Sequence, residues 1–293
     1  MHVPVLLKEA VELLNIREEG VVADVTGGGG GHATEILKRL GEKGRLLILD
    51  RDPEAVESLA KKFSDPRVTV FHAAFSELLE ILKREKIPQL SGLLADLGVS
   101  SFQLDEPARG FSFKPGPLDM RMDTTQGETA WELIQQADEK ELADIIFHLG
   151  EERHSRKLAR AVIAARKEKQ LKTTEDLAEL AQKVLGRGRG KIHPATRMFQ
   201  ALRIAVNSEL EELDWLLKML PQVIAPQGRG VFISFHSLED RRVKVAFKNL
   251  KGNGWKVLTK KPMVAEEEEE QKNPRSRSAK LRAVERGETC REC

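Results

Sequence analysis

Short apolar runs alternate with amphipathic segments over the first third of the chain. The runs at residues 21–26, 45–49, 68–71 and 92–97 are rich in valine, isoleucine and leucine and are predicted to be strands. Between them, apolar residues recur every three or four positions at 33–40, 53–63 and 77–86, which is the spacing of a helix face. Strands that alternate with helices of this length are typical of βαβ units and a parallel sheet.

This rhythm breaks near residue 100. Residues 100–123 contain several prolines and are predicted to be a loop, and helical patterns without a convincing strand follow. The predicted helices are 129–136, 139–149, 153–169, 175–185 and a long one from 194 to about 220, with a break before Pro221. Strands return at 230–235 and 255–259. We therefore predict an α/β core from residues 1–105 and 206–293, interrupted by an all-helical domain over residues 106–205.

Composition and charge narrow the class of protein. No run approaches the ~18 apolar residues that cross a bilayer, and the early charges at the amino terminus are unlike a signal peptide. The chain has two cysteines, so a cytoplasmic location is expected and a disulfide scaffold is not. Its 48 Lys and Arg nearly balance 46 Asp and Glu, but residues 151–206 hold 14 basic against 6 acidic side chains. This segregation is compatible with a phosphate-binding surface, although the same side chains would also solvate helix faces.

Five consecutive glycines, residues 27–31, close the first predicted strand and open the next helix. Glycines at such a turn let the backbone approach a ligand closely. The spacing Gly28-x-Gly30-x-x-Ala33 fits the dinucleotide fingerprint, and Asp50 lies about twenty residues on, where an acid can accept from ribose hydroxyls. From these residues alone, both NAD and S-adenosylmethionine remain open as the ligand.

Other polar and aromatic residues follow the predicted strands. Asp24 lies within the first strand and needs a partner, either a ligand ammonium or loop N–H groups. Phe75 follows the third strand and either stacks on an adenine or belongs to the core. Asp96 ends the fourth strand, where it faces the same crevice or caps the next loop. His236 follows the fifth strand and either positions a substrate and accepts a proton, or belongs to a salt-bridged turn.

Ordered blocks of sequence resemble one known family nearly end to end. They are residues 2–9, 24–32, 95–105, 109–113, 119–122, 199–207, 234–241 and 275–282. On these blocks the chain resembles the bacterial RsmH (MraW) family, the 16S ribosomal RNA cytosine-N4 methyltransferases. The resemblance implies a Rossmann-like, class I S-adenosylmethionine-dependent methyltransferase fold with an inserted helical domain. It also implies cofactor contacts by Gly30, Gly31, His32, Asp50, Phe75, Asp96 and Gln103. Residues 27–31 are more glycine-rich than the family pattern.

The implied reaction methylates a cytidine in the decoding region of 16S rRNA, within the small ribosomal subunit. The amine of cytosine is a poor nucleophile, so it must be oriented and must lose a proton. Asp96 and His236 are the candidates for that work. The base has to leave its stack, and three aromatic residues are candidates for stacking on it, with packing of the insert as the alternative: Phe102, Phe111 and Phe113. The candidate RNA-binding residues are Arg109, Arg187, Arg189, Lys191, Arg197 and Arg203.

Several other expectations complete the sequence-based picture. Cys290 and Cys293 are two ligands without partners nearby, so no metal site is expected. The acidic run at residues 266–270 is predicted to be a solvent-exposed loop. No stable protein partner is expected. The rival functions are an NAD-dependent oxidoreductase and a non-catalytic RNA-binding factor of ribosome assembly.

Overall fold

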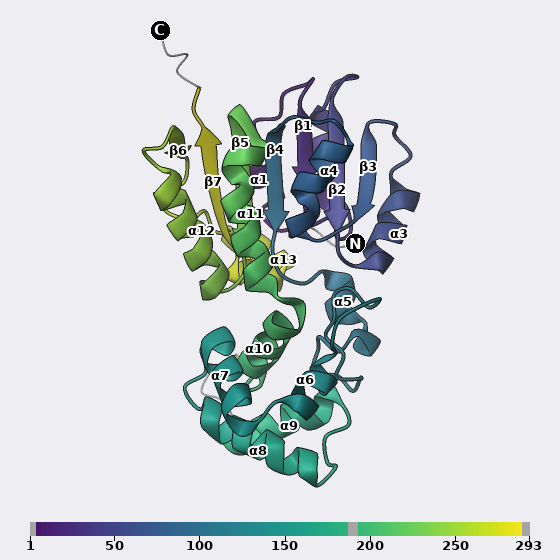
Figure 1. Ribbon diagram of the computed structural model, residues 1–293, viewed down its shortest axis with the longest axis vertical. Helices are drawn as coiled ribbons and strands as arrows, with labels where there is room; N and C mark the ends of the chain where they lie inside the picture. Colours follow the sequence, from purple (N-terminus) through teal and green to yellow (C-terminus); the bar gives the residue numbers. More distant parts are fainter. Residues whose placement is uncertain (1–3, 187–192, 289–293) are drawn as a thin grey trace. The chain divides into compact units, whose positions relative to one another are not determined.

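The apolar runs of the sequence form the strands of one sheet (Figure 1). The structure is a computed structural model that describes residues 4–186 and 193–288. Within this part of the chain the sheet has seven strands in the order β3-β2-β1-β4-β5-β7-β6. The strands are β1 Val21–Asp24, β2 Arg45–Asp50, β3 Val68–His72, β4 Leu90–Asp96, β5 Ile224–Ser234, β6 Trp255–Val257 and β7 Lys280–Arg286. All pairs are parallel except those of β7, which runs antiparallel to β5 and β6.

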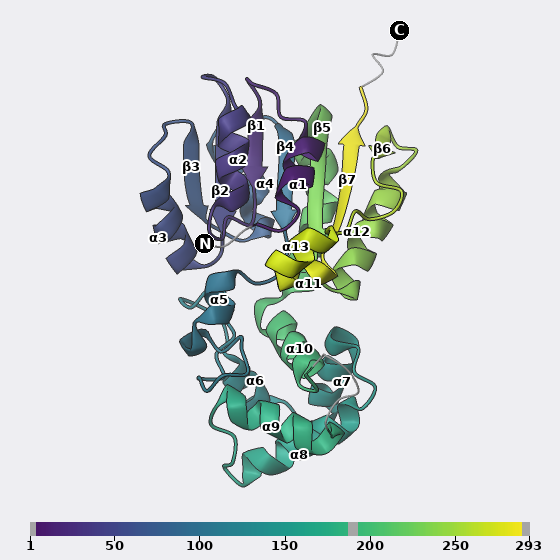
Figure 2. The same cartoon turned by 180° about the vertical axis from the view of Figure 1, so that it is seen from behind.

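Helices cover both faces of this sheet because successive side chains of each strand point to opposite faces. One face packs on α4 (Leu78–Arg84), α11 (Glu209–Val223) and α12 (Ser237–Leu250), in front of the sheet in Figure 1. The other packs on α1 (Leu7–Leu14), α2 (Gly31–Arg39) and α3 (Pro53–Lys62), seen in Figure 2. In β1, for example, Ala23 is buried under the first set and Val22 under the second.

The helical segment forms a second compact unit with a core of its own. It spans residues 99–209, while the sheet unit comprises the chain up to residue 98 and from residue 210. Its α-helices are α5 Ser101–Asp105, α6 Ala130–Gln136, α7 Glu139–Gly150, α8 Ser155–Lys167, α9 Thr174–Leu185 and α10 Thr196–Asn207. Their buried faces meet around Ile134, Ile146 and Leu158. Within the described ranges, no helix combines the length and apolar character needed to cross a membrane.

Two predicted elements are wrong. The helix predicted from 194 to about 220 is two helices, because Ser208 lies between α10 and α11 with a φ of 47°, in the left-handed region. Pro221 does not end a helix but lies inside α11. The acidic run at 266–270 is not a loop: it forms most of α13 (Glu267–Lys272). Acidic side chains suit the first turn of a helix, and Glu269 also makes a tertiary hydrogen bond, described below.

Candidate functional site

The glycine run turns the chain from β1 into α2. Gly30 has a φ of 70°, in the left-handed region, and its N–H donates to the carbonyl of Gly27 over 2.7 Å. A side chain on Gly31 would place its Cβ 2.1 Å from Cγ of Pro4. Both positions therefore require glycine. A Cβ on Gly29 would meet no atom within 4 Å, so the backbone of the loop is open to a ligand there.

Asp50, at the end of β2, holds this loop against the neighbouring strand. Its Oδ2 accepts the N–H of Gly28 over 2.7 Å, and its Oδ1 accepts the N–H of Asp52 over 2.9 Å. Each carboxylate oxygen keeps a further lone pair, so Asp50 can still accept from the hydroxyls of a ligand. On the other side of the loop, Nζ of Lys62 donates to the carbonyl of Gly29 over 2.8 Å. Sequence analysis missed Lys62.

Thr26 joins the ends of β1 and β4. Its hydroxyl accepts the N–H of Asp96 over 2.7 Å and donates to Oδ1 of Asp24 over 3.3 Å. Asp24 is fully buried and also accepts the backbone N–H of Thr26 over 3.1 Å. The loop therefore supplies the hydrogen bonds that the Asp24 carboxylate needs. Loop N–H groups were one of the two partners considered, and a ligand ammonium was the other. Asp96 differs, because its Oδ1 is buried and accepts no hydrogen bond from the part of the chain that the structure describes.

Carboxylates concentrate at this edge of the sheet, and their pKa values rise. Burial raises the pKa of Asp24 to about 7, against the hydrogen bonds from the loop. Burial also raises the pKa of Asp50, although two backbone N–H groups bond its charged form. For Asp96, burial and the negative charges of Asp24 and Glu239 raise the pKa well above its ordinary value. A desolvated site that gathers negative charge favours a cationic ligand.

His32 links the first turn of α2 to the amino-terminal segment. Its Nε2 lies 3.1 Å from the carbonyl oxygen of Val5. Because a carbonyl only accepts, Nε2 carries a proton, and Nδ1 faces Oδ2 of Asp96 at 3.6 Å. Glu269 of α13 holds the same segment from another side, since its Oε1 accepts the N–H of Leu6 over 2.8 Å. Residues from both ends of the described chain therefore support the glycine loop.

This edge of the sheet fits S-adenosylmethionine better than NAD. S-adenosylmethionine carries a sulfonium and an ammonium, which suit the unpartnered acceptor on Asp96 and its acidic neighbours. The lone pairs that Asp50 retains suit the ribose hydroxyls that both ligands possess. The pyrophosphate of NAD is an anion, and the buried carboxylates would repel it. The charge of the site therefore separates two ligands that the glycine spacing could not.

The structure places the other predicted cofactor contacts as follows. Phe75 begins a 3₁₀ turn directly after β3 and lies half-buried against the core under α4. Gln103 belongs to the helical unit, where its Oε1 accepts the N–H of Ser100 over 2.9 Å at the start of α5. The sheet unit thus brings Gly30, Gly31, His32, Asp50 and Asp96 to one edge, with Phe75 at the next strand end.

His236 is the N-cap of α12. Its Nδ1 accepts the N–H of Glu239 over 3.5 Å, and its Nε2 lies 3.1 Å from Oε1 of the same side chain. Oε2 of Glu239 in turn accepts the N–H of Phe235 over 2.9 Å. Asp240 pairs with Arg282 rather than with the histidine, at 2.7 Å. This geometry supports a structural role for His236, the alternative to catalysis.

The predicted RNA-binding arginines have different environments. Arg109 is buried, and its Nη2 donates to the carbonyl of Met122 over 2.9 Å. Arg203 pairs with Glu209 through Nε at 2.7 Å. Arg197 is 55% exposed. The remaining candidates, Arg187, Arg189 and Lys191, lie outside the described residues. Of the three described arginines, Arg197 is therefore the most available to a phosphate.

The three phenylalanines considered for base stacking also differ. Phe111 is buried in the core of the helical unit. Phe113 packs edge-on against Phe199, with 4.8 Å between ring centroids. Phe102 on α5 is 55% exposed. Packing of the insert therefore accounts for Phe111 and Phe113, and Phe102 remains available for stacking.

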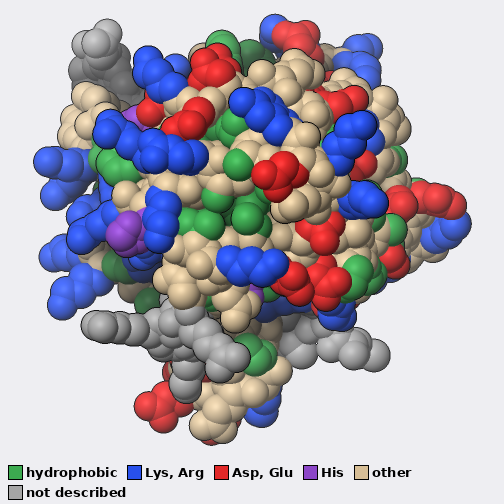
Figure 3. Space-filling view, turned by 90° about the horizontal axis from the view of Figure 1, so that it is seen from below, with side chains coloured by type: hydrophobic (Ala, Val, Ile, Leu, Met, Phe, Trp, Pro, Cys, Tyr) green, Lys and Arg blue, Asp and Glu red, His purple; other side chains and the backbone are tan. Residues whose placement is uncertain are grey.

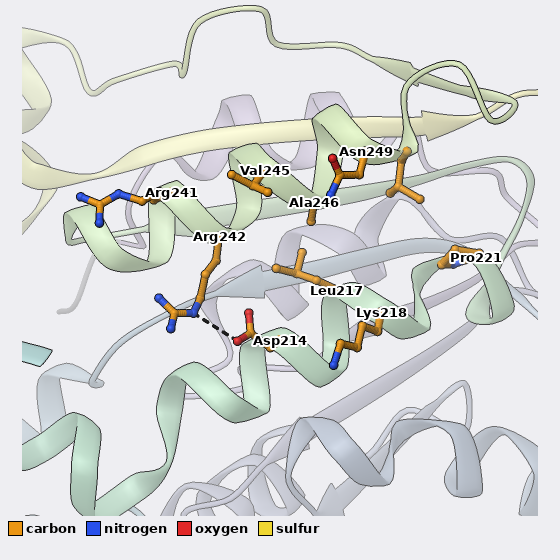
Figure 4. Close-up of a pocket in the computed structure, with 10 residues that line it drawn as sticks. Asp214, Leu217, Lys218, Pro221, Arg241, Arg242, Val245, Ala246 and Asn249 are labelled. Carbon is orange, nitrogen blue, oxygen red and sulfur yellow. Dashed lines mark hydrogen bonds and ion pairs between the residues drawn. The ribbon is translucent and has the colours of Figure 1, made fainter. Parts of the chain in front are cut away.

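A groove of about 470 Å³ lies on the sheet unit between α11 and α12 (Figure 4). Its lining residues all come from these two helices and include none of the predicted cofactor contacts. Arg242 and Asp214 face one another across it, with Nε and Oδ2 3.3 Å apart. The groove is therefore separate from the site at the strand ends.

The strand order, the antiparallel β7 and the acidic strand ends beside a glycine loop define a class I methyltransferase that uses S-adenosylmethionine. Residues 1–287 match the model of the MraW methylase family, and the chain belongs to that family.

Similar proteins agree with this assignment. A protein from Sorangium cellulosum named ribosomal RNA small subunit methyltransferase H is 49% identical, over 97% of this chain and 90% of its own length. A protein of the same name from Koribacter versatilis is 46% identical, over 97% of this chain and 94% of its own length. A crystal structure from Clostridium thermocellum covers 98% of this chain and 100% of that chain, with a TM-score of 0.50 and 11% identity. It shares the fold.

Proposed function

We propose that the chain transfers a methyl group from S-adenosylmethionine to the exocyclic N4 of a cytidine in the decoding region of 16S ribosomal RNA. One observation carries the proposal: Oδ1 of Asp96 is a buried acceptor without a partner among the described residues, beside the glycine loop. An amine that is to be methylated needs such an acceptor for its N–H. The names of the near full-length relatives support ribosomal RNA as the substrate.

Bound S-adenosylmethionine would supply a sulfonium methyl group for in-line attack by the amine nitrogen, with S-adenosylhomocysteine as the leaving group. Asp96, as a carboxylate, accepts a hydrogen bond from the amine and holds its nitrogen in a pyramidal geometry, with the lone pair free to attack. As the new N–C bond forms and the C–S bond breaks, the surplus proton passes from the amine to Asp96. Nδ1 of His32, which faces Asp96 at 3.6 Å, is the next acceptor for that proton.

The helical unit is the proposed RNA-recognition domain. The target base must leave its stack before an enzyme can act on its amine. The exposed ring of Phe102 suits stacking on an unstacked base, and the exposed guanidinium of Arg197 suits a phosphate. We expect the enzyme to act in the cytoplasm on 16S rRNA or the small ribosomal subunit, without a permanent protein partner.

A transfer assay tests the proposed function directly. The purified chain is incubated with tritiated S-adenosylmethionine and either naked 16S RNA or small subunits from a strain that lacks the gene. We expect incorporation at one cytidine, identified as N4-methylated by mass spectrometry of RNA fragments. Cofactor binding with no incorporation into either substrate would instead favour a non-catalytic assembly factor. An unchanged methylcytidine profile in the deletion strain would contradict the proposed target.

A further inference from the structure

The helical unit has an exposed basic surface where the end of α7 meets the start of α8. We name it the α7–α8 corner, and it comprises Phe147, His148, Arg153, Arg156, Lys157 and Arg197. Arg160 of α8 pairs with Glu139 at the start of α7, with Nε and Oε1 3.3 Å apart. Arg197 of α10 reaches the turn between them, since its Nη1 donates to the carbonyl of Glu151 over 3.3 Å.

Two of these cations, Arg153 and Arg156, have no partner among the described residues. Arg153 and Arg156 are exposed and make no hydrogen bond or ion pair through their side chains with any residue of the described chain. Glu152 is the buried acid of the turn: its Oε1 accepts the N–H of His154 over 2.8 Å, and its Oε2 pairs with Nη1 of Arg197 at 3.6 Å. Arg153 and Arg156 therefore carry the unpaired charge. Figure 3 shows the Lys and Arg side chains on the face of the molecule seen from below, with acidic side chains between many of them.

The position of these cations is unfavourable for the helix itself. Arg156 and Lys157 lie in the first turn of α8, and no side chain caps that end of the helix. The helix dipole is positive there, so cations in the first turn destabilise a helix and anions stabilise it. Lys157 donates to the carbonyl of Val184 over 2.7 Å, but Arg156 has no such contact among the described residues. The charge of Arg156 therefore does not serve the stability of α8, and it is complementary to an external anion.

An exposed aromatic ring accompanies the cations. Phe147 is 50% exposed, and its ring meets that of His148 edge-on, with 5.1 Å between centroids. Cations that follow a phosphate backbone, combined with a ring on which a base stacks, are typical of surfaces that bind single-stranded nucleic acid. A partner that offered only acidic side chains would pair with the arginines but would give the ring nothing flat to stack on.

We propose that the α7–α8 corner binds single-stranded RNA, with Arg153 and Arg156 on phosphates and Phe147 stacked on an unpaired base. The proposal rests on the proposed function, because it takes the RNA substrate as the ligand. The α7–α8 corner is a contact surface for that substrate, separate from the residues at the strand ends. The corner would hold RNA that flanks the methylated nucleotide.

The test measures the binding of a short fluorescein-labelled single-stranded RNA by anisotropy over a series of salt concentrations. The double variant Arg153→Ala/Arg156→Ala loses two phosphate contacts, so the slope of log affinity against log salt should fall by about 1.4. Phe147→Ala should weaken binding roughly 5- to 150-fold at one salt concentration, with the slope unchanged. The matched control is Lys167→Ala/Lys172→Ala, which removes two exposed cations at and beyond the other end of α8 and should leave the slope unchanged.

The outcomes separate this inference from the proposed function. Wild-type chain that neither binds nor methylates RNA contradicts the proposed function. Wild-type chain that methylates RNA, while the arginine variant keeps the full salt slope, overturns the α7–α8 corner alone. An equal loss of slope in the lysine control also overturns it, since net charge would then explain binding. An arginine variant that binds RNA normally but no longer binds small subunits would also overturn the inference, because the α7–α8 corner would then contact protein. Binding of S-adenosylhomocysteine should be unchanged in every variant.

Discussion

Nδ1 of His32 lies 3.6 Å from Oδ2 of Asp96, while Nε2 of the same ring is bound to the carbonyl of Val5. The Val5 carbonyl therefore holds a proton on Nε2 of His32, with Nδ1 turned toward Asp96. Asp96, whose pKa is raised by burial and by neighbouring charges, has an imidazole nitrogen beside it. The imidazole ring of His32 therefore links Val5 of the amino-terminal segment to Asp96, the candidate proton acceptor.

Asp96→Asn should lower the rate of methyl transfer roughly 10²- to 10⁴-fold at saturating cofactor, because an amide cannot accept a proton. In the wild type, the rate should fall as the pH falls through the pKa of Asp96, since the protonated acid no longer accepts. Burial and two neighbouring carboxylates raise that pKa, so this limb should lie well above the ordinary pKa of an aspartate, 3.8. Single-turnover rates over a pH series check both points. A variant that kept the wild-type rate and limb would exclude Asp96 as the acceptor.

Glu269→Ala should destabilise the protein by about 1–3 kcal/mol, because the buried N–H of Leu6 loses its charged acceptor. Glu269→Gln keeps an acceptor and should cost less. The matched control is Glu268→Ala, which removes an exposed acid of the same helix and should change stability by less than about 0.5 kcal/mol. Urea unfolding followed by fluorescence measures all three. Equal stability of the Glu268 and Glu269 variants would show that α13 does not anchor the amino-terminal segment.

Buried parallel strands could be predicted from the sequence because they leave continuous apolar runs, as residues 45–49 do. Strand β7 could not be predicted in the same way, since it carries a charged residue, Arg282, at a buried position. That residue is tolerated there because Asp240, 42 residues away in the sequence, accepts from its Nε over 2.7 Å. A partner so distant in sequence leaves no local pattern, so the strand was missed.

The candidate site also combines residues that a local sequence pattern predicts with residues that depend on distant partners. Asp50 and Asp96 could be predicted because each ends an apolar run, and the ends of parallel strands meet at one edge of the sheet. Lys62 and Glu269 bond backbone atoms 33 and 263 residues away, and no local pattern reveals such contacts. The charge of the edge could not be predicted either, because it depends on which carboxylates lie close together in space.

His236→Asn should retain both stability and methyl transfer, whereas His236→Ala should lose about 1 kcal/mol of stability. Asparagine is a strong N-cap and can replace Nδ1 as the acceptor for the N–H of Glu239, while alanine cannot. Thermal unfolding and transfer rates of both variants provide the measurement. An asparagine variant as unstable as the alanine variant would contradict the capping role. Restored stability without restored activity would show that His236 also takes part in the reaction.

Asp24→Asn should stabilise the protein at high pH and have little effect at low pH. The pKa of Asp24 is about 7 in the folded protein and 3.8 in the unfolded chain, so between these values the folded state binds a proton that the unfolded state lacks. Stability therefore falls as the pH rises from about 4 to 7, by an amount of roughly 4 kcal/mol, and stays low above that range. Asparagine imitates the neutral acid and removes this penalty. Urea unfolding without cofactor at several pH values between about 4 and 8 checks it, with the difference between variant and wild type growing as the pH rises. A difference that was constant over this range would show that Asp24 does not titrate in the folded protein.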